Sequence, residues 1–151
     1  MKKHPQLTDS LITVGWREWI LLPDLNLPKI KAKVDTGART SCLHAFQVDP
    51  FTRDGEKWVR FGIHPHQGDL KTEVFCEAKV IDERMISDSG GHQESRYIIM
   101  TEVLLSDQRW PIEISLTNRD TMKFRMLLGR TAMDNRIIVN ASKSYLHGKP
   151  K

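Results

Sequence analysis

The stretch Ile30-Lys31-Ala32-Lys33-Val34-Asp35-Thr36-Gly37-Ala38 is the most informative part of this sequence. Apolar side chains alternate with lysines from Ile30 to Val34, and this period of two predicts a β-strand with one buried face. Asp35 falls on the lysine side, so its carboxylate leaves the strand opposite the apolar face. Thr36 can fix the following turn through its hydroxyl, and Gly37 lets a second backbone approach without a Cβ atom in the way.

A carboxylate in this position suits one half of a two-carboxylate hydrolytic site. Hydrolysis of an amide by unactivated water needs one carboxylate to take a proton from the water and one protonated carboxyl to polarise the carbonyl. Two carboxyls that share a proton cannot both ionise, so acid and base coexist in the pair. We find one convincing half-site, at Asp35, so a dyad requires two copies of the chain. The same residues also form an ordinary strand-ending turn, in which Asp hydrogen-bonds its own backbone.

Further stretches make the chain similar to the retropepsin-like aspartic peptidases, and within them to a bacterial family labelled ATP-dependent zinc protease. The matching stretches are Gly15–Trp19, Ile30–Ser41, Trp110–Glu113, Leu116–Arg119 and Met126–Arg130. The resemblance implies an all-β, retropepsin-like closed barrel with one short helix near Thr131–Asn135. It also implies that the apolar run ending at Gly129 crosses the loop of Asp35, although such a run is also typical of any buried strand with a glycine turn. Asp35, Thr36 and Gly37 would then be the catalytic residues of a homodimer.

Neither a metal nor a nucleotide cofactor is indicated by the residues themselves. A zinc hydrolase needs three protein ligands and an open fourth position, and the sequence has no His-Glu-x-x-His motif. Only His64-Pro65-His66 is clustered among the six histidines, and its proline predicts a solvated turn. No glycine-rich loop of the Gly-x-x-x-x-Gly-Lys-Ser/Thr type is present to cradle phosphates. We therefore expect metal-independent chemistry without a cofactor.

Alternating side chains predict further strands, and polar residues between them predict hairpin turns. The strands are expected at Trp58–Ile63, Val74–Val80, Arg96–Leu105 and Trp110–Leu116, with a turn at Ser106–Arg109. Asp88-Ser89-Gly90-Gly91 could spell a second half-site, but the polar residues after it favour a hairpin tip instead. By resemblance, the hairpin over residues 84–96 is where a retropepsin carries its mobile flap. Gly90 and Gly91 would then contact substrate, whereas an ordinary exposed hairpin fits the sequence equally well.

One departure from the retroviral pattern concerns the position after Ala38. By resemblance an acid is expected there, paired with the arginine after the late glycine and close to the substrate main chain. Here the two positions are Arg39 and Arg130, so two cations meet unless Asp120 or Asp134 compensates. Alternatively, Arg39 is a solvated surface charge without a role.

An electropositive cleft would favour an acidic substrate. Arg119 and Arg125, on the connecting segment, would add further guanidinium groups to it. The association of the family with glutamate ligases agrees with this expectation. We therefore expect a substrate with an acidic or glutamate-rich tail, bound by Ala38, Arg39, Gly90, Gly91 and Arg130.

Length and composition fit one domain, which we expect over residues 11–146, with an N-terminal extension at 1–10 and a tail at 147–151. The net charge of +4 is small and the cations are dispersed, which argues against a nucleic-acid partner. The sequence contains no run of about 20 apolar residues, the length that a membrane span needs. No signal segment is evident either, so we expect a cytoplasmic protein. Cys42 and Cys76 are expected as reduced thiols, with Cys42 acting as a small apolar residue.

Two classes of function remain open at this point. The first is an aspartic endopeptidase that works as a homodimer on a protein or peptide substrate. The second is a non-catalytic peptide-binding module that retains the retropepsin-like fold, because a fold alone does not establish a function.

Overall fold

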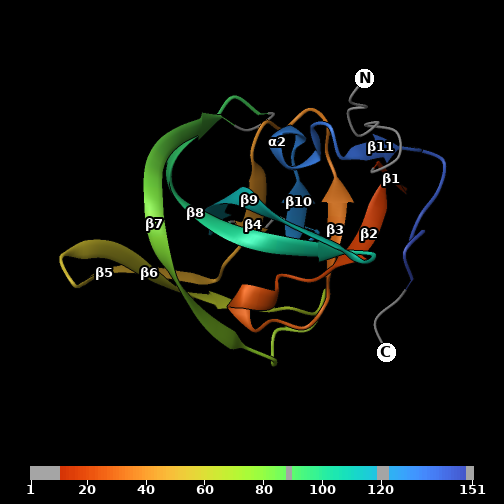
Figure 1. Ribbon diagram of the computed structural model, residues 1–151. Helices are drawn as coiled ribbons and strands as arrows, with labels where there is room; N and C mark the ends of the chain where they lie inside the picture. Colours follow the sequence, from red (N-terminus) through yellow and green to blue (C-terminus); the bar gives the residue numbers. More distant parts are fainter. Residues whose placement is uncertain (1–10, 88–89, 119–122, 149–151) are drawn as a thin grey trace, which may run out of the picture.

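Residues 11–87, 90–118 and 123–148 are described by the structure, a computed structural model, and they are mostly strands (Figure 1). The strands are β1 (Ile12–Val14), β2 (Arg17–Ile20), β3 (Ile30–Val34), β4 (Ser41–His44), β5 (Gln47–Arg53), β6 (Glu56–Ile63), β7 (Val74–Ser87), β8 (Gln93–Leu105), β9 (Gln108–Thr117), β10 (Met126–Leu128) and β11 (Ile137–Val139). Within these ranges there is one α-helix, α2 (Arg130–Met133), and one 3-10 helix, η1 (Pro23–Leu25). The prediction of an all-β fold with one short helix is confirmed.

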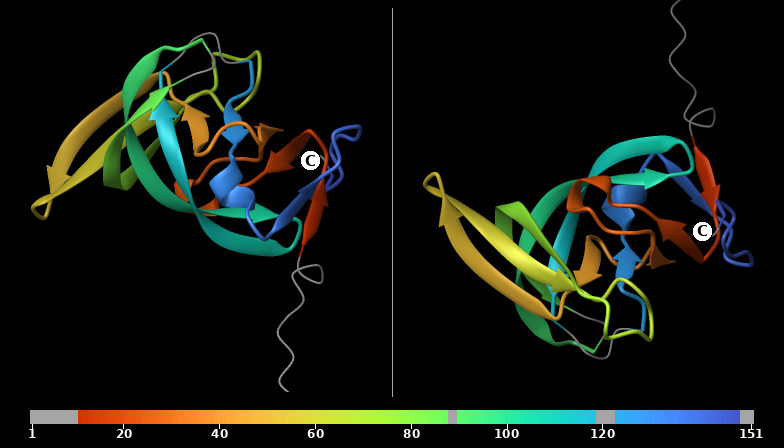
Figure 2. Two further views of the ribbon diagram at one scale, coloured as in Figure 1. Left: turned by 90° about the horizontal axis from the view of Figure 1, so that it is seen from above. Right: turned by 90° about the horizontal axis from the view of Figure 1, so that it is seen from below.

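Nine strands form one sheet in the order β2-β3-β10-β4-β9-β8-β7-β6-β5, and β1 pairs with β11 in a separate parallel ribbon. β10 lies between β3 and β4, so the late apolar run joins the strand before Asp35 to the strand after it. β7 and β8 form a long curved hairpin, and the β5–β6 hairpin projects away from the rest of the chain (Figure 2).

The predicted closed barrel is corrected to a strongly curved sheet whose order ends at β2 and β5. Among the described residues one isolated bridge connects the β2 end to β8, where Leu21 and Leu104 exchange hydrogen bonds of 3.1 and 2.8 Å. Pro23 follows two residues later and starts η1. Because proline has no N–H to donate and its ring fixes φ, the ladder cannot continue beyond this bridge.

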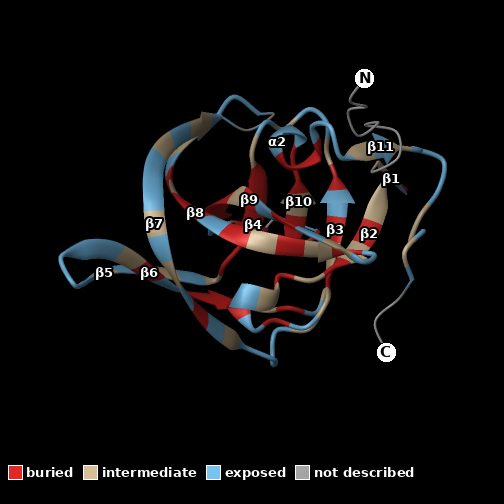
Figure 3. Cartoon of the chain, viewed as in Figure 1, coloured by how far each residue is buried: buried red, intermediate tan, exposed pale blue. Residues whose placement is uncertain are grey.

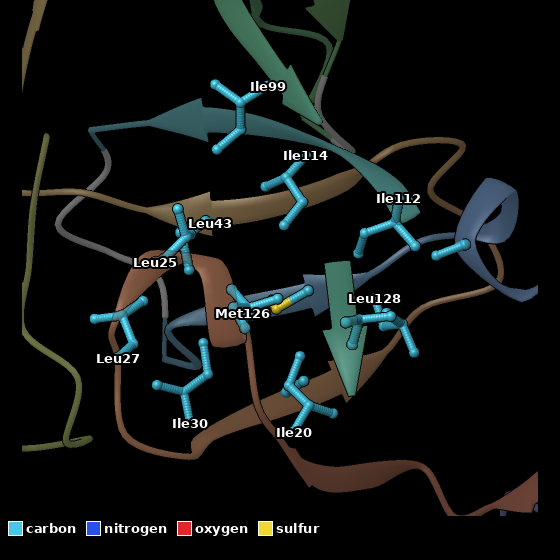
Figure 4. Close-up of a cluster of buried hydrophobic side chains, with 14 of the residues drawn as sticks. Ile20, Leu25, Leu27, Ile30, Leu43, Ile99, Ile112, Ile114, Met126 and Leu128 are labelled. Carbon is cyan, nitrogen blue, oxygen red and sulfur yellow. The ribbon is translucent and has the colours of Figure 1, made fainter. Parts of the chain in front are cut away.

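The concave side of the sheet encloses the hydrophobic core (Figure 3). Ile30, Ala32 and Val34 are buried, while Lys31 and Lys33 on the same strand point away from the core, as the alternation predicts. The close-up shows side chains from both ends of the chain meeting in this cluster (Figure 4). The labelled residues are Ile20, Leu25, Leu27, Ile30, Leu43, Ile99, Ile112, Ile114, Met126 and Leu128.

A buried carboxylate, Glu18 on β2, fastens the C-terminal segment to the start of the domain. It accepts hydrogen bonds from the backbone N–H groups of Gly15, Leu146 and His147 at 2.8, 2.9 and 3.1 Å. Gly15 has no room for a side chain, because a Cβ atom there would lie 2.1 Å from the carbonyl oxygen of Lys143. The packed part of the chain therefore extends at least to His147.

We expect the substitution Glu18→Ala to lower the free energy of unfolding by about 3 kcal/mol, because it leaves several backbone N–H groups without an acceptor. Urea denaturation of the variant and the wild type measures the difference. Glu83→Ala removes an exposed carboxylate that pairs with Lys57 and should leave stability nearly unchanged. Equal effects of the two substitutions would contradict the role assigned to Glu18.

Candidate active site

The backbone around Asp35 is held from two sides. The Asp35 N–H donates to the carbonyl of Leu128 on β10 at 2.9 Å, and the Val34 N–H donates to the carbonyl of Trp16 at 2.8 Å. Beyond β3 the chain turns, with the Ala38 N–H donating to the carbonyl of Asp35 at 3.2 Å. The direction in which the carboxylate leaves the sheet is thus set by neighbouring strands.

One oxygen of the Asp35 carboxylate is used within the turn and the other is open. Oδ1 accepts a hydrogen bond from the Gly37 N–H at 3.0 Å, the local bond expected of Asp at a turn. Oδ2 forms no hydrogen bond with the described residues, and the side chain is half-buried. The carboxylate is therefore oriented through one atom and available to water or to a second carboxyl through the other.

The loop from Asp35 to Ser41 is clamped by the element that follows β10. The N–H groups of Arg130 and Thr131 donate to the carbonyls of Ala38 and Arg39 at 2.7 and 2.9 Å. They belong to the first turn of α2, where N–H groups have no partner within the helix. The Gly129 N–H donates to the Ser41 hydroxyl at 2.9 Å.

Gly129 has no space for a side chain at this contact. A Cβ atom there would lie 2.6 Å from the carbonyl carbon of Thr40 and 2.7 Å from the nitrogen of Ser41. Close approach of two backbones therefore requires glycine. In this structure the Gly129 element crosses the loop of Asp35, the arrangement that the resemblance implied.

Of the two arginines singled out in the sequence, Arg39 belongs to this loop and Arg130 contacts it from α2. A guanidinium N–H of Arg130 donates to the carbonyl of Thr36 at 3.2 Å. Arg39 is exposed and forms no ion pair or hydrogen bond through its side chain with the described residues. Asp134 does not compensate it, since Asp134 forms no ion pair in the same part of the chain, and Asp120 lies outside the described residues.

An acid near this loop comes from β9, where it binds a third arginine, and sequence reasoning missed both residues. Glu113 binds Arg84 of β7 with both carboxylate oxygens, at 2.8 and 3.2 Å. Arg84 also donates to Asp82 at 2.6 Å. Hydrogen bonds to Arg84 lower the pKa of the Glu113 carboxyl below its usual range, and Arg39 contributes a smaller effect in the same direction.

The Arg84–Glu113 pair spans a strand. β8 lies between β7 and β9, and Arg84 is opposite Arg96 whereas Glu113 is opposite Met100. The two side chains meet although their positions are offset by four residues along β8. The Asp82-x-Arg84 spacing places two side chains on one face of a strand, but nothing in the sequence indicates the contact across β8.

A second arginine fixes the stem of the same hairpin. Arg96 on β8 is buried and donates to Glu94 at 2.7 Å. Its terminal nitrogen also lies 3.5 Å from the Cys42 sulfur and from the Ser115 hydroxyl. Cys42 is buried as expected, but its surroundings are polar.

The predicted hairpin over residues 84–96 is present, with β7 and β8 paired as far as Ser87 and Gln93. Gly90 and Gly91 are exposed at its tip, and Gly91 has a positive φ of 83°. Asp88 and Ser89 lie outside the described residues. The role of this hairpin as a flap stays a prediction.

Arg125 does not belong to this site, contrary to the prediction. Its side chain is buried and its Nε donates to the carbonyl of His64 at 2.7 Å, at the end of β10 away from Gly129. His64 itself stacks on Phe46 with ring centroids 4.2 Å apart, so the predicted solvated turn is wrong for this residue. Arg119 lies outside the described residues.

No group of three His, Cys, Asp or Glu side chains with the geometry of a metal site occurs in the part of the chain that the structure describes. In that same part, no helix has the length and apolar character needed to cross a membrane.

Comparison with known proteins places these features in a family. The sequence model of a family described as "Retropepsin-like aspartic endopeptidase RimB" matches residues 13–150. The crystal structure of a protein of unknown function from Legionella pneumophila subsp. pneumophila is similar, with a TM-score of 0.74 and 25% identity over 89% of this chain and 97% of that one.

Curated relatives are longer proteins. One from Shewanella pealeana is 46% identical over 143 residues, which are 95% of this chain and 31% of the relative. One from Desulfotalea psychrophila is 49% identical over 127 residues, which are 84% of this chain and 27% of the relative. Both are named "Probable alpha-L-glutamate ligase". The chain thus spans less than a third of the length of these two relatives.

The substitution Gly129→Ala should lower the free energy of unfolding by about 1–3 kcal/mol, because the new methyl group overlaps the backbone of the loop. Thermal or urea denaturation measures this. In Gly37→Ala the Cβ atom meets only the Asp35 carboxylate, at 3.3 Å, so a smaller loss is expected. A Gly129→Ala protein as stable as the wild type would show that the close contact is not essential.

A second expectation concerns pH. Because the folded pKa of Glu113 is lowered, the stability it contributes is present above its unfolded pKa and is lost as pH falls through the folded value. Glu113→Gln should therefore lower the free energy of unfolding by about 0.5–1 kcal/mol at neutral pH, a modest effect because the pair is about one-third exposed. The difference should shrink at about pH 3. Urea titrations of both proteins at the two pH values test this, and a constant difference would contradict it.

Proposed function

The chain belongs to the family of RimB-like retropepsin-like aspartic endopeptidases, and we propose that it hydrolyses peptide bonds with a dyad built from Asp35 of two copies. The observation that carries this proposal is the Asp35 loop itself. Its carboxylate is half-buried, is oriented through Oδ1 by the Gly37 N–H, and keeps Oδ2 open. The backbone that holds it is fixed by β10 and α2.

In the proposed reaction the two carboxyls have different protonation states. One Asp35 is ionised and takes a proton from the attacking water, while the partner's Asp35 is protonated and donates to the substrate carbonyl oxygen. The close approach of two carboxyls favours one shared proton. A symmetric dimer supplies this pair because the same surface of each copy faces the other.

Arg130 and Gly37 would act as positioning residues in this site. The bond from Arg130 to the Thr36 carbonyl and the bond from Gly37 to Asp35 Oδ1 both restrict the loop. A carboxylate held in one orientation loses less entropy when it reaches the reactive geometry.

For the substrate we propose a peptide with acidic side chains, such as a glutamate-rich tail. Arg39, four positions after Asp35, supports this proposal. Its side chain is exposed and forms no ion pair with the described residues. The name of the longer relatives refers to ligation of alpha-L-glutamate. A region like this chain therefore occurs in proteins whose name concerns the addition of glutamate.

Mixing wild-type chains with Asp35→Asn chains tests the shared dyad. If each active site needs Asp35 from both copies, activity should follow the square of the wild-type fraction, about one quarter at equal amounts. If each chain works alone, about one half remains. The two proteins are mixed in denaturant, refolded together and assayed on a glutamate-rich peptide, with and without a chelator.

The matched control is Asp134→Asn, which removes an exposed carboxylate at the end of α2 and should leave activity unchanged in every mixture. Full activity of Asp35→Asn, or complete loss of wild-type activity with the chelator, would overturn the proposed chemistry. Peptide binding without hydrolysis by the wild type would instead favour a non-catalytic binding module.

A further inference from the structure

A pocket lies between the end of the Asp35 loop and the β7 arm of the long hairpin. Its volume is about 410 Å³, and it is lined by Arg39, Thr40, Arg84, Met85, Ile86 and Ser87. The volume falls within the usual range of ligand sites. Two guanidinium groups and two small hydroxyl side chains make its lining suitable for an anion, while Met85 and Ile86 offer contacts for an aliphatic stem.

The two arginines of this pocket differ in their partners. Arg84 is bound by Glu113 through two hydrogen bonds and by Asp82 through a third. Arg39 has no such partner among the described residues and is exposed. The charge of Arg84 is therefore compensated within the chain, and Arg39 provides the uncompensated positive charge of the pocket.

Glu113 binds Arg84 in the two-oxygen geometry that a ligand carboxylate would use. A carboxylate with both oxygens on one guanidinium is the favoured arrangement for carboxylate recognition. The side chains of Arg84 and Glu113 are 35% and 30% exposed, so the pair is partly solvated and its exchange for another carboxylate costs little. Arg96, which is 7% exposed and bound to Glu94, lacks this freedom because a buried charge cannot lose its partner cheaply.

We propose that this pocket is a subsite for one acidic side chain of a bound peptide, in which Arg39 binds the ligand carboxylate and Glu113 competes with the ligand for Arg84. The proposal rests on the proposed function only in taking a peptide as the ligand. Glu113, which binds Arg84 without itself lining the pocket, then acts as an internal substitute for the substrate carboxylate. A ligand with one carboxylate gains little binding free energy by displacing Glu113 from Arg84. A ligand with a run of acidic side chains gains more.

Binding to the Asp35→Asn protein tests the subsite separately from catalysis. The probes are fluorescein-labelled hexaglutamate and hexaglutamine, measured by fluorescence anisotropy. Arg39→Gln should weaken hexaglutamate binding about tenfold, the loss of one charged hydrogen-bonding partner. Glu113→Gln should tighten it several-fold by removing the competitor. Hexaglutamine binding should be unaffected, and the effects should shrink as salt rises.

Arg53→Gln and Glu77→Gln are the matched controls, because Arg53 and Glu77 form a similarly exposed ion pair outside the pocket lining. Both should leave hexaglutamate binding unchanged. The subsite is refuted if Arg39→Gln behaves like Arg53→Gln, and the competition is refuted if Glu113→Gln weakens binding. Hydrolysis by the wild type without these binding changes would reject the subsite alone, whereas the binding changes without hydrolysis would reject the peptidase alone.

Discussion

The close contact between Gly129 and the backbone of Thr40 and Ser41 is the constraint on which the candidate site depends. Two backbones that approach this closely exclude any Cβ atom, and the approach brings the first N–H groups of α2 onto the carbonyls of the Asp35 loop. β10 also pairs with β3 on one side and β4 on the other. One short element therefore positions the chain before and after Asp35, which explains how so small a loop can hold a carboxylate in one orientation.

A second set of interactions connects the long β7–β8 hairpin to β4 and β9. Arg96 is buried and its partners are fixed, so it anchors the stem of the hairpin. Arg84 lies opposite Arg96 on β7, at the same level of the hairpin, but it is partly exposed and is bound by two carboxylates. Because buried charges are costly to separate and exposed pairs are not, Arg96 is held in place while Arg84 can exchange partners. At this level of the hairpin the β8 side therefore has a fixed contact and the β7 side has one that can meet a ligand.

Local patterns predicted several parts of the structure well. The alternation from Ile30 to Val34 predicted which side of β3 is buried, and the polar residues after Leu105 predicted a tight turn, which is formed by Ser106 and Asp107. Closure of the sheet was not predictable in this way, since it depends on curvature and on Pro23 ending the pairing of Leu21 with Leu104. Arg125 was misplaced for a related reason. It precedes β10 at the end away from Gly129, and its side chain binds the carbonyl of His64 there.

The sequence by itself determined the strands and the turn that carries Asp35, because side-chain period and turn residues are local properties. The close approach of a second backbone, expected at Gly37, occurs at Gly129 instead, since a Cβ atom on Gly37 would meet only the Asp35 carboxylate among the described residues. The surroundings of that turn were decided only by the tertiary structure. Arg39 follows Asp35 in the chain, but whether it meets a compensating acid depends on strands more than forty residues away. Arg84 reaches across β8 to Glu113, and this contact, which no local pattern encodes, leaves Arg39 as the open positive charge of the loop.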